Sequence, residues 1–239
     1  MSDLKVWLTI PTGKPRGYLQ DIIKDSQIPL DQIVIVHTIE SEPIEGVRNV
    51  WDLDPHNIQR WWNKGIDIAR ANGGDYIAVL NDDLLLKDNP INTIAQAMRD
   101  NDAILGYPHP HSGNGLTRTA GYCWVLDLKS GLRTDETLRW YYGDDDMLLQ
   151  AVAMGKVINV PADVKHLNGV VQTSNNKYLI TLAKIDQVYF KEKWSKRFMR
   201  DNKNGIMKQT LLNQLLVKYG LHGGWVPPDW DHGSQDANK

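Results

Sequence analysis

The chain has 239 residues, a formal net charge of −2 and 41% hydrophobic residues. These values fit one α/β domain, alone or with an extension, and they allow a sizeable core. No apolar run approaches the ~20 residues that a bilayer-spanning helix needs, so we expect no membrane span. The polar first residues lead directly into an apolar run, which predicts no secretory signal. The single cysteine, Cys123, excludes an internal disulfide framework and favours a reducing compartment, so we expect a cytoplasmic protein.

Strand and helix signals alternate through the first half of the chain. Short apolar runs end at turn residues, and amphipathic segments of helical period separate them. Asp54 and Pro55 are typical of a helix cap and first helical position, and a further helix is predicted from Pro90. Cys123 lies in an apolar run and is predicted to be a core residue. In chain order, the predicted strands are residues 6–10, 32–36, 47–51, 76–80, 103–106, 120–128 and 157–160.

Single helices between strands predict a mostly parallel, doubly wound sheet. Residues 109–119 are rich in Gly, Ser and His and are predicted to form a mobile loop. A helix is predicted to follow residues 143–146 and to end at Gly155. From Lys177 onward the pattern is helical and basic, with an irregular tail. We therefore predict an α/β domain in residues 1–176 and a helical, basic C-terminal extension in residues 177–239.

Two carboxylates and an amide stand where the run 76–80 ends, at Asn81, Asp82 and Asp83. In an open α/β sheet, ligands bind at the carboxyl ends of the strands. An oxygen-only cluster suits a hard cation such as Mg²⁺ or Mn²⁺, which can in turn hold a diphosphate. The alternative is a plain turn at the strand end, because Asn and Asp bond to their own backbone.

A second acidic group occupies residues 144–146, all Asp, directly after the aromatic run 140–142 and Gly143. Acids at a helix start complement the helix dipole, so capping is one interpretation. Three acids in succession exceed what a cap needs. An aromatic wall beside a carboxylate is typical of sugar binding, and loss of hydration there raises the pKa of the acid towards general-base use.

His166 follows a predicted strand. A lone His is more often a hydrogen-bonded surface group, but an imidazole can complete a mixed oxygen and nitrogen site, which Mn²⁺ accepts more readily than Mg²⁺. The sequence has no glycine-rich dinucleotide-binding motif after its first strand, no phosphate-binding P-loop and no Gly-x-Ser-x-Gly elbow. The first two absences argue against a dehydrogenase and a P-loop hydrolase.

The order of these motifs resembles the GT-A-fold glycosyltransferases, specifically the inverting family-two type. Residues 57–66 are similar to that family's helix with its Asn-x-Gly-Ile signature, and residues 81–83 to its Asp-x-Asp metal motif. Residues 131–136, followed by 141–147, resemble its Gly-x-Phe-Asp-Glu segment and the Glu-Asp-x-Asp-Leu after it. His166 falls where the family has a late His. Each motif is short, and the resemblance depends on their order.

The resemblance implies a GT-A, Rossmann-like domain that binds a nucleotide-sugar, a UDP-sugar in the first instance, and an acceptor. It implies metal-dependent transfer of a hexosyl or pentosyl group to an acceptor hydroxyl with inversion. Asp144 would be the base, and Asp146 would complete the catalytic group by orienting the helix start. Asp83 would bind Mn²⁺ or Mg²⁺, with His166 as a possible second ligand. The other implied contacts are Pro11, Thr12, Glu40, Asn63, Asn81 and Asp82 for the donor, and Trp140, Tyr142 and Asp145 for the acceptor.

Three positions depart from the family pattern. The family usually follows its second strand with acids that read the base, whereas residues 37–40 here are His-Thr-Ile-Glu. The nucleotide therefore stays open, and Glu40 is a candidate base or ribose contact. Gly143 replaces the usual Glu, and Trp62 stands where an Arg is common.

The acceptor is open as well. Residues 177–218 hold ten Lys or Arg and three acids, a net charge of +7, which suits either a solvated helix face or a polyanionic partner. The aromatic residues interleaved with these charges favour nucleic acid, so hydroxylated DNA bases are one hypothesis. Saccharides, lipid-linked sugars and proteins are the other candidate acceptors. The interleaved residues are Tyr189, Phe190, Trp194 and Phe198.

Two other classes of protein compete with a glycosyltransferase. Gly143 and the acids after it resemble the Gly-Asp-Asp turn of RNA-dependent polymerases, but that turn joins two strands, whereas residues 147–154 look helical. A non-catalytic nucleotide-sugar or nucleic-acid binding protein would keep the fold without turnover. Hydrolysis of nucleotide-sugars with Mn²⁺ and no acceptor discriminates between the last alternative and an enzyme.

Overall fold

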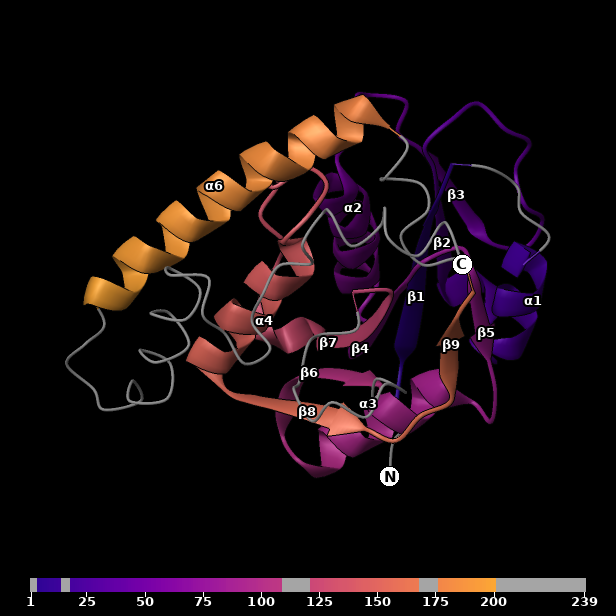
Figure 1. The fold of residues 1–239 in the computed structure, drawn as a ribbon. Helices are drawn as coiled ribbons and strands as arrows, with labels where there is room; N and C mark the ends of the chain where they lie inside the picture. The colour runs from indigo at the N-terminus through magenta and orange to yellow at the C-terminus, as the bar shows by residue number, and fades with distance from the viewer. Residues whose placement is uncertain (1–3, 14–17, 109–120, 168–175, 201–239) are drawn as a thin grey trace, which may run out of the picture.

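A computed structural model describes residues 4–13, 18–108, 121–167 and 176–200 (Figure 1). The predicted loop at 109–119 and the irregular tail lie outside these residues. The strands are β1 (Val6–Thr12), β2 (Ile33–His37), β3 (Arg48–Trp51), β4 (Tyr76–Leu80), β5 (Leu84–Leu86), β6 (Ala103–Pro108), β7 (Cys123–Asp127), β8 (Lys156–Val160) and β9 (Val164–His166). The α-helices are α1 (Tyr18–Asp25), α2 (Ile58–Ala71), α3 (Pro90–Asp100), α4 (Gly143–Met154) and α6 (Lys177–Arg200), and 3₁₀ turns cover Leu30–Gln32 and Leu128–Ser130.

Seven strands form one mixed sheet in the order β3-β2-β1-β4-β7-β6-β8. All neighbouring pairs are parallel except the two made by β7, which runs antiparallel to β4 and to β6. The connection from β1 leads outward through β2 to β3, and the chain then returns to place β4 on the other side of β1. The predicted mostly parallel, doubly wound sheet is confirmed.

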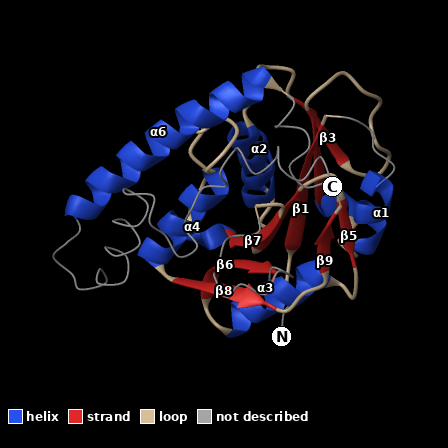
Figure 2. Ribbon diagram, viewed as in Figure 1, coloured by secondary structure: helices blue, strands red, loops and turns tan. Residues whose placement is uncertain are grey.

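Helices cover both faces of the sheet (Figure 2). Side chains of α1 and α3 pack with Leu8 and Ile10 of β1 on one face, and side chains of α2 and α4 pack with Trp7 on the other. Strands buried on both faces are continuous apolar runs, which is why the sequence signals them clearly. Cys123 is fully buried in this core, and burial raises the pKa of its thiol, so the prediction of a core cysteine is confirmed.

The start of α2 differs from the prediction of a cap and first helical position at Asp54 and Pro55. The helix begins at Ile58, and Asn57 is its N-cap: the Asn57 Oδ1 accepts the backbone N–H of Arg60 at 3.1 Å. The Asn57 Nδ2 also donates to the carbonyl oxygen of Glu136 at 2.9 Å. One side chain thus caps the helix and ties it to a distant loop, and a contact of that kind leaves no signal in the local sequence.

The strands β5 and β9 form a separate antiparallel ribbon that the sequence analysis did not predict. Each has three residues, too few to show a period. Their inward side chains, Leu84, Leu86 and Val164, are buried in the same core as α1 and α3. The ribbon pairs Leu84 with His166 and so fixes the position of that imidazole.

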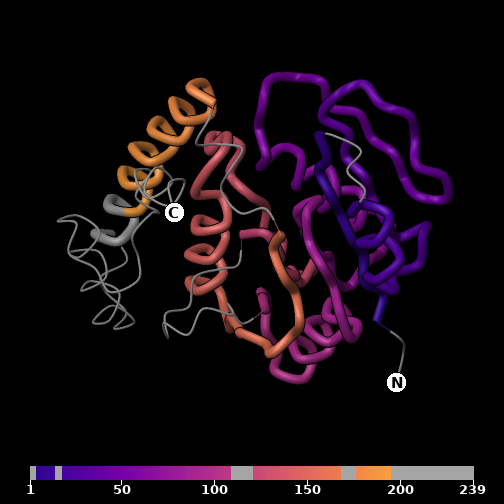
Figure 3. Tube along the Cα trace, turned by 45° about the vertical axis from the view of Figure 1, so that its right-hand side comes forward, coloured from indigo at the N-terminus to yellow at the C-terminus, as the bar shows by residue number. Residues whose placement is uncertain are grey.

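The helix α6 lies along α4 at one side of the molecule (Figures 1 and 3). Its inward side chains Phe190 and Trp194 are buried with Leu138 and Tyr142, which precede α4. Residues 177–194 of the predicted extension therefore pack directly on the α/β domain. Among the described residues, no helix is long and apolar enough to cross a membrane.

Gly65 tests how closely α2 packs on β1. A Cβ atom at this position would overlap the side chain of Thr9. We expect Gly65→Ala to lower the free energy of unfolding by about 1–3 kcal/mol, the usual cost of overpacking a core. Urea denaturation measures the change.

The control is Gly155→Ala, because the nearest atom to a Cβ there is 3.5 Å away and the backbone is extended. Equal stability of the two variants would contradict the close approach of α2 to β1.

Candidate functional site

The candidate site lies at the carboxyl ends of β1 and β4, the adjacent strands between which the strand order reverses. Open α/β sheets bind ligands at such a point. Thr12 ends β1, and its Oγ1 donates to the Asp82 Oδ2 at 2.9 Å. Asn81 and Asp82 are both partly exposed here, as a ligand contact requires. The structure therefore brings together Thr12, Asn81 and Asp82, three of the predicted donor contacts.

Asp83 and His166 meet at this edge although 83 residues separate them. The Asp83 Oδ1 and the His166 Nε2 are 3.0 Å apart. The backbone N–H of Leu167 donates to the carbonyl oxygen of Asp83 at 3.0 Å, which extends the β5–β9 ribbon. The two predicted metal ligands are thus adjacent, and Asp83 is 7% exposed.

Tyr122 is a member of this cluster that the sequence analysis missed. Its ring stacks on that of His166, with centroids 5.0 Å apart and an interplanar angle of 18°. Its carbonyl oxygen accepts the backbone N–H of Asn81 at 2.9 Å. The Asn81 Nδ2 lies 3.5 Å from the His166 Nε2. Burial raises the pKa of the Tyr122 hydroxyl, which therefore stays protonated.

Asp144 reaches the same cluster through Gly121. The carboxylate of Asp144 lies so close to Gly121 that a Cβ atom at 121 would overlap its Oδ2. Gly121 directly precedes Tyr122, whose ring covers His166. The first acid of α4 therefore lies beside the residue that precedes Tyr122, and Tyr122 in turn contacts His166. Asp144 and its neighbour Asp145 are both partly exposed in the first turn of α4.

Asp146 lies away from this group. It is fully buried, and its Oδ1 accepts the Trp194 Nε1 at 2.8 Å and the Lys193 Nζ at 2.7 Å. Its Oδ2 accepts the Gln150 Nε2 at 2.7 Å. With both oxygens occupied inside the protein, Asp146 is an anchor between α4 and α6, and it directs no oxygen to a substrate.

The loop before α4 is also fixed by α6. The buried carboxylate of Asp186 accepts the backbone N–H groups of Arg139, Trp140 and Tyr141 at 3.0, 2.7 and 2.9 Å. Tyr142 is buried and stacks on Phe190, with ring centroids 5.1 Å apart. Of the predicted acceptor contacts, Trp140 is half-exposed, whereas Tyr142 is part of the packing under α6.

Asn63 is buried beneath a loop of the chain. Its Oδ1 accepts the backbone N–H of Thr134 at 3.0 Å, and its Nδ2 donates to the Glu136 Oε1 at 2.8 Å. Asn63 therefore holds the loop before α4, and the structure does not bring it to the edge where Thr12 and Asp82 meet. Pro11 lies near the carboxyl end of β1, and Glu40 follows the carboxyl end of β2. Both residues are at least partly exposed.

Gln59 explains why Gly stands at position 143. Any Cβ at 143 would overlap the side-chain amide of Gln59. This amide is fully buried, and neither its oxygen nor its nitrogen has a hydrogen-bond partner among the described residues. Gln59 thus occupies the space in which a side chain at 143 would begin.

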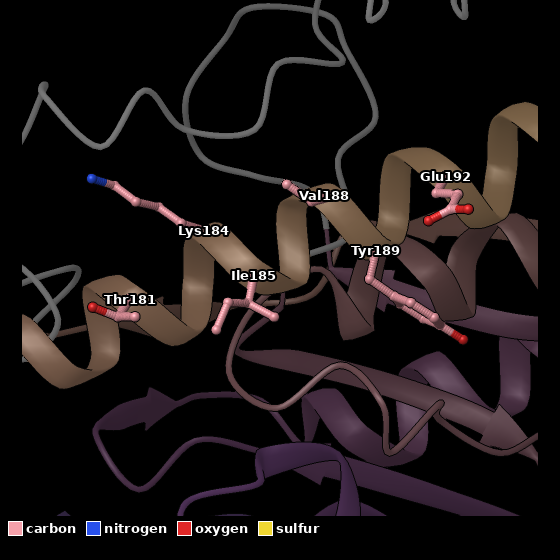
Figure 4. Close-up of a pocket in the computed structure, with 6 residues that line it drawn as sticks. All are labelled: Thr181, Lys184, Ile185, Val188, Tyr189 and Glu192. Carbon is pink, nitrogen blue, oxygen red and sulfur yellow. The ribbon is translucent and has the colours of Figure 1, made fainter.

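In the described part of the basic segment, Phe190 and Trp194 point into the protein, whereas Tyr178 is exposed. Phe190 and Trp194 are buried, and Tyr189 donates its hydroxyl to the Asp135 Oδ2 at 3.0 Å. The face of α6 turned to solvent instead carries a shallow, mostly apolar hollow (Figure 4). This hollow shares no residue with the acidic edge, so it is not part of the candidate site. It is lined by Thr181, Lys184, Ile185, Val188, Tyr189 and Glu192.

The fold matches glycosyltransferases of known structure. Mannosyltransferase PcManGT from Pyrobaculum calidifontis, solved with GDP-Man and Mn²⁺, matches with a TM-score of 0.53 and 12% identity over 66% of this chain and 55% of that one. GalNAc-T7, solved with UDP, GalNAc and Mn²⁺, matches with a TM-score of 0.57 and 13% identity, over 69% of this chain and 44% of that one. S. aureus TarS matches with a TM-score of 0.58 and 9% identity, over 90% of this chain and 43% of that one.

The chain thus spans about half the length of these proteins, and the match establishes its fold as GT-A. No family model and no curated protein matches the sequence.

Lys193 joins α6 to the loop before α4 and to the first turn of α4. Its ammonium contacts Asp135 at 2.6 Å and the buried Asp146 at 2.7 Å. We expect Lys193→Met to lower the free energy of unfolding by about 3 kcal/mol, because it leaves a buried carboxylate without its cation. Denaturant titration measures the loss. Lys184→Met, at an exposed position of the same helix, is the control and should change little.

The pH dependence gives a second measure of the Lys193 contacts. Burial raises the pKa of Asp135, but the hydrogen bonds from Lys193 and Thr137 and the charge of Lys193 together outweigh this and hold the pKa below its ordinary value. A lowered pKa contributes stability above the unfolded value, about 4, and this contribution is lost as the pH falls through the folded pKa. The difference between wild type and Lys193→Met should therefore shrink on acidification. A constant difference would contradict the ion pair.

Proposed function

We propose that the protein is a metal-dependent glycosyltransferase that moves a sugar from a nucleotide-sugar to an acceptor hydroxyl with inversion. The observation that carries the proposal is the convergence of three distant segments at one edge of a GT-A sheet. Asp83 contacts His166, and Asp144 joins them through the backbone of Gly121 and the ring of Tyr122. A structural turn or a helix cap alone would not require these segments to meet.

The donor would lie across the carboxyl ends of β1 and β4. Thr12, Asn81 and Asp82 would contact the ribose and diphosphate, with Pro11 and Glu40 nearer the base. A nucleotide-sugar fits the ligands of the similar structures, which contain GDP-Man in one case and UDP with GalNAc in another. We take a UDP-sugar as the first candidate donor.

Asp83 and His166 would hold the metal ion, Mn²⁺ or Mg²⁺. They offer one oxygen and one nitrogen 3.0 Å apart, from the turn after β4 and from β9. In the described part of the chain no group of three His, Cys, Asp or Glu side chains could hold a metal ion. Two protein ligands still suit such an ion, because it commonly completes its shell with waters and substrate phosphates. When bound, it would neutralise the charge of the departing diphosphate.

Asp144 would act as the general base. It can accept the proton of the acceptor hydroxyl, whose oxygen then attacks the anomeric carbon from the face opposite the diphosphate. The C–O bond to the diphosphate breaks as the new glycosidic bond forms, which inverts the configuration. Asp145, in the same turn, would contact the acceptor.

Two measurements test the proposal together. A thermal-shift panel of nucleotide-sugars with Mn²⁺ reports donor binding, and release of nucleoside diphosphate without acceptor reports cleavage. We expect stabilisation by one donor and its slow hydrolysis. Binding without any cleavage would favour the alternative, a non-catalytic nucleotide-sugar binding protein. The absence of both would refute the proposal.

Asp83→Ala tests the metal site. It should abolish metal-dependent turnover and weaken nucleotide-sugar binding, because the carboxylate that would hold the ion is removed. Isothermal titration with Mn²⁺ and donor, alongside the hydrolysis assay, measures both effects. Asp31→Ala, an exposed aspartate outside the cluster, is the control. Retention of Mn²⁺-stimulated turnover in Asp83→Ala would exclude Asp83 as a ligand.

Asp144→Asn tests the base. It should leave donor affinity nearly unchanged and lower the rate of sugar transfer by a factor of about 10²–10⁴, the usual contribution of general-base catalysis. Steady-state kinetics with donor and acceptor measures this. Near-normal transfer would show that the role is wrong.

Gly121→Ala probes the same role with Asp144 left in place. Its Cβ would displace the Asp144 carboxylate, so transfer should fall while donor binding persists. A Gly121→Ala enzyme with normal kinetics would mean that the position of this carboxylate does not matter.

A further inference from the structure

Four aromatic rings from three segments meet where the loops before α2 and α4 approach the first turn of α6. His56, in the loop before α2, has its ring centroid 5.9 Å from that of Trp61, 5.8 Å from Trp140 and 5.9 Å from Tyr178. Trp140 precedes α4, and Tyr178 lies in the first turn of α6. The rings meet edge-on or tilted, an arrangement that aromatic pairs favour. Figure 1 shows the first turn of α6 close to the start of α2.

Hydrogen bonds fix these segments to one another. The backbone N–H of Ile58 donates to the carbonyl oxygen of Arg139 at 2.8 Å, which ties the loop of His56 to that of Trp140. The Asp186 carboxylate of α6, only 1% exposed, accepts the N–H of Trp140 at 2.7 Å. The rings are therefore held in place before any ligand arrives, which lowers the entropic cost of binding.

The cluster is buried at its base and open at its surface. Trp61 is 5% exposed, whereas Tyr178 is 47% exposed, and His56 is exposed as well. The hydrophobic core gains little from rings that remain in water. Trp140 stands four residues before Asp144, which lies in the first turn of α4, so the loop that carries Trp140 leads directly to the group that would activate the acceptor.

We propose that His56, Trp140 and Tyr178 form the acceptor subsite and that this subsite binds the ring of a saccharide. The inference rests on the proposed function and names its acceptor class. Ligand sites combine aromatic walls with a few polar groups. The C–H face of a sugar ring can pack on the aromatic surface, while its hydroxyls reach the polar edge of His56.

Charge favours a saccharide over a nucleic acid at this place. The segments that carry the rings hold two exposed acids, Asp54 and Glu136, and two exposed cations, Arg139 and Lys177. Such a balance gives little attraction for a polyanion, whose binding depends on an excess of cations. The aromatic residues of α6 that would stack bases, Phe190 and Trp194, are 5% and 6% exposed.

The test measures binding and catalysis separately. Saturation-transfer NMR with a panel of methyl glycosides and short oligosaccharides reports binding, with a single-stranded oligonucleotide as the second arm. The best saccharide is then used as acceptor. Tyr178→Ala and His56→Ala should each weaken saccharide binding and raise the acceptor KM at least tenfold, without changing donor hydrolysis. Tyr178→Phe should retain binding, and Val188→Ala, on the solvent face of α6, is the control.

The outcomes separate this inference from the function on which it rests. Loss of saccharide binding in Tyr178→Ala and His56→Ala but not in Tyr178→Phe supports the subsite, whatever the donor assay gives. Normal donor hydrolysis with unchanged acceptor KM in the two alanine variants overturns the subsite and leaves the glycosyltransferase intact. Binding of the oligonucleotide in place of every saccharide, or of no saccharide by the wild type, overturns the ligand class.

Discussion

The candidate site depends on the placement of β4 beside β1. The chain leaves β1 on one side and returns to β4 on the other, so the two connections diverge above neighbouring strand ends. That divergence leaves room at the edge where Thr12 and Asp82 meet. The β5–β9 ribbon begins directly after Asp83 and brings His166 back to it. Pairing of β4 with β3 would have left two strands between Thr12 and the acids.

The helix α6 holds the loop before α4 and the start of α4 in place. Its inward residues bind the loop before α4 and the first turn of α4 through Asp186, Lys193 and Trp194. Part of the positive charge that suggested a polyanion-binding surface, that of Lys193, therefore forms internal ion pairs with Asp135 and Asp146. The division of the chain at residue 176 remains a prediction about domains, but the first 18 residues beyond it stabilise the α/β part.

The sequence predicts the strands well because both faces of the sheet are buried, and its strand-end acids predict the site edge. The sequence does not predict the contacts between distant segments. The bond from the Asn57 side chain to the carbonyl oxygen of the distant Glu136 has no local signal, and the β5–β9 ribbon is too short to show a period. Asp144 and Asp146 are both acids of the first turn of α4. The Asp144 side chain lies next to Gly121, whereas the Asp146 side chain is buried inside the protein. The family resemblance correctly predicts the GT-A fold.

The contact between Gln59 and Gly143 makes two positions 84 residues apart interdependent. A related chain with the family's Glu at 143 would need a much smaller residue at 59, or a shifted α4. With Gln59 in place, a side chain at 143 would push the start of α4 away, and the carboxylate of Asp144 with it. A smaller residue at 59 removes this conflict, so we expect positions 59 and 143 to vary together in related chains.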